Sequence, residues 1–443
     1  MNNFAEYIKN YTDGKSVCIL GFGREGKSTY RILDKYCTPK SIAVADLFDV
    51  DREKNGLPEN IELICGEDYQ KSLDRFDIVF KSPGIVLEKH PSEHKCEISS
   101  ETQVFFTVFR EQIIGITGTK GKSTVTSLIY HILSENGRDS RICGNIGIPV
   151  FDIAEGVTDE TAIVCELSCH QLEYMTVSPS KAVFLNLYEE HLDHYGTMEN
   201  YYNAKKNIYL HQQNNDTLWI NSELDRKAVP SKAVTVSNSD ENADLVIKNA
   251  SAKSSDGNSY AIPVDDIKLL GIHNHYNIGI AWDVCRNYVS EEEFTKALAS
   301  FCPLAHRLEY AGTFKGIRWY DDSISTACAT AIEALKSVPN ADTILIGGMD
   351  RGIDYTTLAD YLSSHDYNVI CMEASGKRVY DMIKTPDRDN IRYVPHLEDA
   401  VKLASEITAE GKSCVMSPAA ASYGIFKNFE ERGDVFKALV AKL

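Results

Sequence analysis

The hydrophobic positions of this chain form short apolar runs that alternate with longer amphipathic stretches. Residues 16–22 read SVCILGF, an apolar run that predicts a buried strand. The stretch GKSTYRILDKY that follows has helical spacing, and SIAVAD and FDIVFKSPGI predict two more strands. Because strands and helices alternate, we expect an open parallel sheet with helices packed on its faces.

The same alternation starts again twice along the chain. Near residue 98, QIIGITGTKGKSTVTSLIYHILSENG predicts a strand, a loop and a helix that ends at Gly137, and AIVCELS and KAVFLNL add strands. From residue 303 onward, IRWYDDS, TILIGG, NVICMEA and CVMSPAA predict strands between helices. We therefore expect an α/β protein with three domains, over residues 1–97, 98–302 and 303–443.

Composition narrows the classes of partner. The net charge of −18 argues against a nucleic acid held through its phosphates. No apolar run approaches the ~20 residues that span a bilayer, and the polar N-terminus does not predict a signal peptide. Twelve cysteines without a C-x-x-C pair fit free thiols in a reducing compartment. We expect a cytoplasmic monomer with no membrane or nucleic-acid partner.

The segment GITGTKGKST, residues 115–124, has the composition of a phosphate-binding loop but not its usual spacing. The P-loop pattern requires glycine five residues before Gly121, where Ile116 stands. The loop lies between a predicted strand and a predicted helix, so its N–H groups can face a phosphate at the positive helix end. Lys122 would reach the terminal phosphates, and Ser123 or Thr124 would help to hold magnesium. The alternative is a glycine-rich turn with an exposed lysine.

Three other residues could complete a nucleotide site. Glu166 ends the strand AIVCELS, about where the metal-binding acid of a P-loop enzyme belongs, although such a carboxylate is otherwise usually a solvated loop residue. His191 follows another strand, and metal, substrate and surface roles are all open for it. Lys205 lies in YYNAKKNIY, and its pattern alone indicates a solvated helix lysine.

The N-terminal GFGREG carries a second phosphate-site pattern. Gly21, Gly23 and Gly26 have G-x-G-x-x-G spacing, and Asp46 lies twenty residues past Gly26 at the end of the next strand. This pattern supports a diphosphate or ribose site without identifying the ligand. A dehydrogenase does not need the P-loop, and a kinase or GTPase does not need the first pattern. An enzyme that couples ATP to a nucleotide-carried substrate uses both.

With both phosphate-site patterns present, the sequence resembles the Mur ligases of peptidoglycan synthesis. GTKGKST matches the family's G-T-[NK]-G-K-[ST], in which the residue at Ile116 is the ordinary form. The resemblance extends over nearly the whole chain. The matching segments are SPGI, GNIG, ELSCHQLE, NLYEEHLDHY, AKKNIY, GIHNHYN, HRLE, DDS and SPAAASYGIFKNFEERG.

This resemblance implies a Rossmann-like first domain that binds UDP, a central P-loop ATPase-like domain, and a Rossmann-like third domain that brings the amino acid. Within the family, the sequence is similar to the members that add glutamate to UDP-N-acetylmuramoyl-L-alanine. These are ATP- and Mg²⁺-dependent amide-forming ligases that act through an acyl phosphate and release ADP and phosphate. D-glutamate is slightly favoured as the amino acid, with L-glutamate as the alternative.

The patterns and the resemblance together give the candidate sites. Lys122, Lys205 and His191 are the candidate catalytic residues. The nucleotide candidates are Gly118, Thr119, Lys120, Gly121, Lys122, Ser123, Thr124, Asn274, Arg307 and Asp322. The metal candidates are Ser123, Glu166, His191 and, if it is carbamoylated as in the family, Lys205. The substrate candidates are Gly21, Gly23, Gly26, Asp46, Ser82, Asn145, Ser168, Gln171, Thr326, Arg351, Ser422 and Phe429.

Two departures from the family pattern concern the amino acid. Ile324 in DSIST replaces a lysine of D-S-K-A-T, and Arg351 stands where relatives have a second lysine. The pair resembles a subgroup that adds L-glutamate. Other functions fit less well. A folylpolyglutamate synthase does not need the N-terminal pattern, the P-loop disfavours an NAD-dependent oxidoreductase, and the intact candidate residues disfavour a non-catalytic nucleotide-binding protein.

Overall fold

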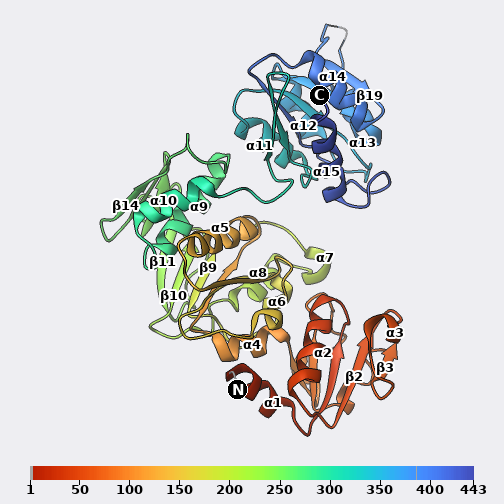
Figure 1. The fold of residues 1–443 in the computed structure, drawn as a ribbon, viewed down its shortest axis with the longest axis vertical. Helices are drawn as coiled ribbons and strands as arrows, with labels where there is room; N and C mark the ends of the chain where they lie inside the picture. Colours follow the sequence, from red (N-terminus) through yellow and green to blue (C-terminus); the bar gives the residue numbers. More distant parts are fainter. Residues whose placement is uncertain (1–2, 386) are drawn as a thin grey trace. The chain divides into compact units, whose positions relative to one another are not determined.

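The computed structural model describes residues 3–385 and 387–443, which form three sheets with helices around them (Figure 1). The chain divides into two compact units. The first contains the residues up to Ile262 together with Asn277–Ala297, and the second contains Pro263–Tyr276 together with Leu298–Leu443. The α/β class that the sequence predicts is confirmed.

The first sheet has five parallel strands in the order β3-β2-β1-β4-β5. Its strands are β1 (Ser16–Leu20), β2 (Ser41–Asp46), β3 (Glu62–Cys65), β4 (Ile78–Lys81) and β5 (Glu97–Ser99). Its helices are α1 (Asn3–Thr12), α2 (Arg24–Tyr36), α3 (Arg52–Asn55), η1 (Leu73–Arg75) and η2 (Pro91–Glu93). Because β1 lies between β2 and β4, the loops after these three strands meet at one edge, where the strand order reverses.

The central sheet has nine strands in the order β14-β13-β12-β11-β10-β9-β6-β8-β7. They are β6 (Ile113–Thr117), β7 (Ser140–Gly144), β8 (Ala162–Glu166), β9 (Lys181–Phe184), β10 (Thr217–Asn221), β11 (Lys232–Ser237), β12 (Leu245–Lys248), β13 (Ser251–Ser254) and β14 (Ser259–Ala261). The accompanying helices are α4 (Glu101–Phe109), α5 (Lys122–Glu135), η3 (Val150–Ile153), α6 (Cys169–Leu172), α7 (Leu192–Tyr195), α8 (Met198–Lys206), α9 (Ile272–Cys285) and α10 (Glu291–Ser300). Fully buried β6 lies between β8 and β9, so three strand ends converge beside its loop.

The first two sheets share one hydrophobic core within the first unit. The Phe4 ring lies 5.0 Å from Phe151 and 5.9 Å from Phe109, and one buried cluster contains residues from both sheets. The expected boundary between residues 97 and 98 falls inside β5. The exact domain boundaries therefore stay a prediction.

The second unit contains a six-stranded sheet in the order β15-β16-β20-β17-β18-β19. Its strands are β15 (Glu309–Phe314), β16 (Ile317–Asp321), β17 (Ala341–Ile346), β18 (Asn368–Met372), β19 (Ile391–Val394) and β20 (Ser413–Met416). The helices are α11 (Cys328–Ser337), α12 (Thr356–Ser363), α13 (Glu373–Ile383), α14 (Leu397–Ile407) and α15 (Phe429–Val440). Only β15 runs antiparallel to its neighbour in this sheet. Among the described residues, no helix is both long and apolar enough to cross a bilayer.

Candidate active site

The glycine-rich loop of residues 118–121 connects β6 to α5, as the sequence predicts. Gly118 has φ of 155° and Gly121 has φ of 86°, a region that favours glycine. A Cβ atom on Gly121 would also lie only 2.9 Å from the Asn277 Oδ1 atom. The loop thus turns tightly into the first residue of α5, Lys122, and its N–H groups lie at the positive end of a fourteen-residue helix.

Asn186 holds the outer part of this loop. The backbone N–H groups of Thr119 and Lys120 donate to Asn186 Oδ1 over 3.1 and 2.8 Å, and Asn186 Nδ2 donates to the Lys120 carbonyl over 3.0 Å. The sequence analysis did not single out Asn186. Its only signal was its place in KAVFLNL, two residues past the end of β9, which the sheet places beside β6.

Two lysines, half-buried Lys122 and buried Lys205, donate to one carbonyl oxygen of the loop. Lys122 Nζ donates to the Gly118 carbonyl over 3.0 Å, and Lys205 Nζ donates to the same oxygen over 2.8 Å. Burial lowers the pKa of Lys122. Burial, followed by the charge of Lys122, lowers the pKa of Lys205 to about 7. The pattern-based interpretation of Lys205 as a solvated helix lysine is wrong, because its side chain lies over the Tyr201 ring and is 1% exposed.

Glu166 ends β8 beside β6 and is almost fully buried. Asn145 Nδ2 donates to Glu166 Oε1 over 2.7 Å, whereas Glu166 Oε2 has no hydrogen-bond partner among the described residues. A buried carboxylate oxygen without a donor is unfavourable unless a cation compensates it. The solvated-loop alternative is therefore wrong for Glu166, and its chemistry fits a divalent cation.

His191 lies at the start of α7 with φ of 58°, a conformation that is uncommon for a residue with a side chain. Its ring lies 5.1 Å from His170 and 6.0 Å from Tyr201, and the side chain is 45% exposed. The neighbouring Glu190 pairs with Lys120 over 2.8 Å. Backbone strain of this kind concentrates at functional positions, although metal, substrate and surface roles stay open for His191.

The first glycine-rich loop has a different construction. A Cβ atom on Gly26 would lie 2.1 Å from the Gly21 carbonyl oxygen, so this glycine permits close packing of α2 on the loop. The Asp46 carboxylate accepts hydrogen bonds from the N–H groups of Phe22 at 2.7 Å and Phe48 at 3.0 Å. Asp46 thereby fixes the two neighbouring loops at the sheet edge, while Gly23 precedes the first residue of α2.

An apolar rim surrounds this edge of the first sheet. Among residues 3–100, the exposed large hydrophobic side chains are Leu47, Phe48 and Val86, with exposures of 45%, 74% and 59%. All three belong to the loops after β2 and β4, on either side of the glycine-rich loop after β1. Exposed apolar side chains at one edge of a sheet are typical of a contact surface. The sequence analysis did not detect them, because isolated hydrophobic residues in loops carry no periodic signal.

Hydrogen bonds connect this edge to the predicted substrate residues of the central sheet. Ser168 and Gln171 form a capping box at α6, and Gln171 Nε2 donates to Glu25 Oε1 over 3.0 Å. Burial raises the pKa of Glu25 to about 7. Ser82 Oγ donates to the Gly21 carbonyl over 2.8 Å. The fold therefore brings the first glycine-rich loop together with segments from β4 and α6.

In the second unit, a cavity of about 300 Å³ is lined by two of the predicted substrate-binding residues. Thr326 and Arg351 contribute to its wall together with Met349, Ile353, Tyr355, Ala420 and Ala421. Ser422 directly follows the last of these residues but does not line the cavity, and the Phe429 ring instead lies 6.1 Å from His306. Arg351 is the charged residue of this wall, while the aliphatic Ile324 is half-buried nearby in sequence.

The residues of this unit that are predicted to bind the nucleotide differ in exposure. Asn274 is buried in α9 and donates from Nδ2 to the Leu270 carbonyl over 2.6 Å. Asp322 is buried, accepts a hydrogen bond from Ser417 Oγ over 2.7 Å, and has its pKa raised to about 7 by burial. Arg307 is exposed between two residues with positive φ. Its side chain remains accessible to an anionic ligand.

Comparisons with known proteins agree with this geometry. The sequence pattern of the Mur ligase middle domain matches residues 116–285, which include both lysines and Glu166. A UDP-N-acetylmuramoylalanine–D-glutamate ligase of Acetivibrio thermocellus is 31% identical over 99% of this chain and 98% of its own length. The enzyme of the same name from Ligilactobacillus salivarius is 32% identical over 97% of both chains.

Solved structures show the same fold at lower sequence identity. The MurF ligase of Thermotoga maritima, solved in complex with ADP, is 18% identical with a TM-score of 0.59, over 97% of this chain and 96% of that one. The UDP-N-acetylmuramate–alanine ligase MurC of the same organism is 17% identical with a TM-score of 0.59, over 97% and 99% of the two chains. These likenesses extend over all three sheets.

Proposed function

The chain belongs to the Mur ligase family of ATP-dependent, amide-forming ligases, and we propose that it joins glutamate to UDP-N-acetylmuramoyl-L-alanine in peptidoglycan precursor synthesis. The observation that carries this proposal is full-length similarity to D-glutamate ligases, combined with the convergence of Lys122, Lys205 and Glu166 at the glycine-rich loop. The names of these relatives favour D-glutamate. The L-enantiomer is the second candidate, on the basis of Ile324 and Arg351 alone.

The reaction that we propose has two steps. A carboxylate oxygen of the substrate attacks the γ-phosphorus of ATP, and ADP leaves. The glutamate nitrogen then attacks the acyl carbon, phosphate leaves with the bonding electrons, and the new amide nitrogen loses its proton. Lys122 stabilises negative charge at the β- and γ-phosphates, and the loop N–H groups orient them.

The residues present fit a magnesium ion. Glu166 Oε2 is a buried oxygen with no hydrogen-bond partner among the described residues. Glu166, His191 and Ser123 would hold the ion, and a carbamate on Lys205 would be a further anionic ligand. The ion would neutralise charge on the transferring phosphoryl group. In a reaction between two anions, Lys122 and this cation together would lower the barrier.

The proposal also assigns a role to each part of the chain, a compartment and an oligomeric state. We assign UDP binding to residues 1–97, ATP binding to residues 98–302 and glutamate binding to residues 303–443. We also propose that the protein acts in the cytoplasm as a monomer. Limited proteolysis and analytical ultracentrifugation test the boundaries and the oligomeric state.

Phosphate release provides the test of the activity. The assay contains UDP-N-acetylmuramoyl-L-alanine, MgATP and one glutamate enantiomer at a time. We expect release only when all three substrates are present, with D-glutamate preferred. A clear preference for L-glutamate would replace the stereochemical part of the proposal. No release with either enantiomer, from folded protein that binds ADP, would contradict the activity itself.

A further inference from the structure

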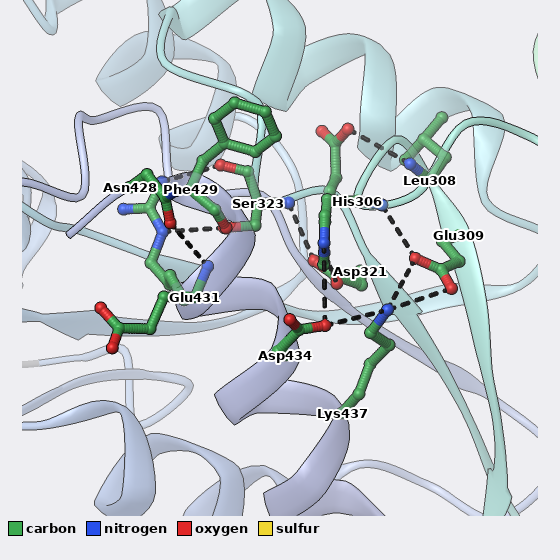
Figure 2. A network of polar contacts seen from close by, with 12 residues as sticks. His306, Leu308, Glu309, Asp321, Ser323, Asn428, Phe429, Glu431, Asp434 and Lys437 are labelled. Atoms are coloured by element: carbon green, nitrogen blue, oxygen red, sulfur yellow. Dashed lines mark hydrogen bonds and ion pairs between the residues drawn. The ribbon is translucent and has the colours of Figure 1, made fainter. Parts of the chain in front are cut away.

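Two turns of the second unit carry Arg307 and Asp322, and several contacts cross-link them. Ile324 N donates to the His306 carbonyl over 3.2 Å, and Leu308 N donates to Asp322 Oδ1 over 3.3 Å. The His306 ring makes the shortest contact, with Nδ1 lying 2.7 Å from Asp321 Oδ2 (Figure 2). The turn of residues 306–308 therefore depends on the turn of residues 321–324 for its position.

The first of these turns has an unfavourable backbone. His306 has φ of 63° and Leu308 has φ of 46°, so both residues that flank Arg307 lie in the left-handed region. Histidine adopts this region occasionally, whereas leucine rarely does. Such a conformation persists only where surrounding contacts hold it. The contacts available here are the cross-links to the second turn and the hydrogen bond from His306 N to Glu309 Oε2 over 2.8 Å.

The start of α15 is shaped to accept the His306 ring. A Cβ atom on Gly433 would lie 2.0 Å from His306 Nδ1 and 2.5 Å from Asp321 Oδ2. The φ of Gly433 is not positive, so the requirement for glycine is spatial rather than conformational. Arg432 is fully buried beside it and donates to the Ser323 carbonyl over 2.8 Å. Helix α15 thus holds the turn of residues 321–324 through Arg432 and leaves space for the His306 ring at Gly433.

We propose that His306 is a positioning residue for nucleotide binding. By donating from Nδ1 to Asp321, it holds the strained turn against the Asp321–Ile324 turn, so that Arg307 and Asp322 are presented together. The inference rests on the proposed function, because it assumes that these two residues contact ATP. His306 itself touches neither substrate in this account. Gly433 acts indirectly, because its lack of a side chain leaves space for the His306–Asp321 hydrogen bond.

A cation bound in this cluster is a less favourable explanation. His306, Glu309 and Asp321 offer ligand atoms within 4.8 Å of one another. However, Lys437 Nζ already lies 3.1 Å from Glu309 Oε2, and Asp321 Oδ1 accepts from Ser323 N over 2.9 Å. Figure 2 shows that Lys437 contacts both Glu309 and Asp434 in this network. A side-chain ammonium thus supplies the positive charge that an ion would bring.

Two substitutions at one position separate the hydrogen bond from the backbone strain. Both His306→Gly and His306→Asn tolerate positive φ, but only asparagine can donate to Asp321 from near the Nδ1 position. Affinity for MgADP is measured by calorimetric titration without the other substrates. We expect His306→Gly to weaken it about 10-fold or more, because the hydrogen bond involves a charged partner, and His306→Asn to stay within about threefold. Lys377→Met, which removes an exposed lysine that pairs with Asp381 outside this network, is the control and should bind MgADP normally.

Steady-state kinetics provide the second measurement. His306→Gly should raise the KM for ATP while leaving the KM values for glutamate and the UDP-linked substrate within about twofold. Gly433→Ala should reproduce this selective defect, because its Cβ displaces the ring. Equal nucleotide affinity in the glycine and asparagine variants, or an equal loss for all three substrates, would overturn the proposal. Normal MgADP binding by a wild-type protein that forms no amide would instead contradict the proposed function.

Discussion

The two glycine-rich loops of the first unit have the same backbone plan but different chemistry. Each follows a central parallel strand and leads into the N-terminus of a helix. At the first loop, Gly26 of α2 allows close packing against the Gly21 carbonyl, and Arg24, the first residue of that helix, is exposed. At the second loop, half-buried Lys122 from α5 and buried Lys205 from α8 both donate to the Gly118 carbonyl.

This difference separates holding an anion from reacting with one. Helix N-termini and loop N–H groups suffice to bind a diphosphate whose charge does not change. A phosphoryl group in transfer redistributes its charge, and preorganised cations stabilise that change most strongly where water is excluded. We therefore interpret the first loop as a substrate anchor and the second as the reacting centre.

The largest effect should come from the cation of the second loop. Lys122→Ala is expected to lower kcat about 10²–10³-fold, the range for removing one electrostatic contact to a transition state. Affinity for the UDP-linked substrate should not change. Arg24→Ala is the matched variant at the first loop. It should weaken binding of the UDP-linked substrate while leaving kcat unchanged. If Lys122→Ala retained near-normal kcat, the two loops would not differ as described.

The second large effect should come from removing Lys205, which tests whether a carbamate on this lysine is needed for activity. Lys205→Ala should lose activity on the order of 10²-fold, whereas the neighbouring Lys206→Ala should not. The pKa of Lys205 is about 7, so its neutral, carbamate-forming amine increases as the pH rises through 7. With limiting bicarbonate, wild-type activity should rise across this range. Full activity of Lys205→Ala at low Mg²⁺ would exclude the carbamate.

The packing role of the first loop can be tested with a pair of glycines. Gly26→Ala places a Cβ atom 2.1 Å from the Gly21 carbonyl, whereas Gly23→Ala meets nothing within 4 Å. Overpacking of this kind costs about 1–3 kcal/mol of folding stability, so Gly26→Ala should lower the melting temperature. Because the clash also displaces the loop, the KM for the UDP-linked substrate should rise. Gly23→Ala is the control. An equal rise in the KM for ATP would show that the two loops are not separate sites.

The smallest expected effect concerns the apolar rim of the first loop. Phe48 is 74% exposed beside Asp46, where its ring could stack on a nucleobase. Because stacking on an aromatic side chain is worth about 1–3 kcal/mol per base, Phe48→Ala should weaken UDP binding about fivefold or more. Calorimetric titration with UDP measures this change directly, and MgADP serves as the control ligand. Unchanged UDP affinity would remove Phe48 from the anchor.

Sequence patterns predicted those parts of the site that are local in the chain. The phosphate loop, Glu166 and the first glycine-rich loop each lie where an apolar strand ends, so the strand pattern and the glycine spacing together predicted their positions. The Asn186 clamp and the burial of Lys205 arise from long-range packing between β9, α8 and the loop, for which a single sequence carries no periodic signal. The positive φ of His306 also depends on partners distant in sequence, including Asp321.

The shared carbonyl at Gly118 implies a trade-off between stability and activity. In the unfolded chain, the pKa of Lys205 returns to about 10.4, well above its folded value of about 7. Between these two pKa values, the unfolded state binds more protons than the folded state. The free-energy cost of burying Lys205 is therefore complete below pH 7 and declines as the pH rises toward 10. Replacing Lys205 with methionine should therefore produce a more stable but inactive protein. If Lys205 carries the proposed carbamate, its burial lowers the stability of the fold in return for activity.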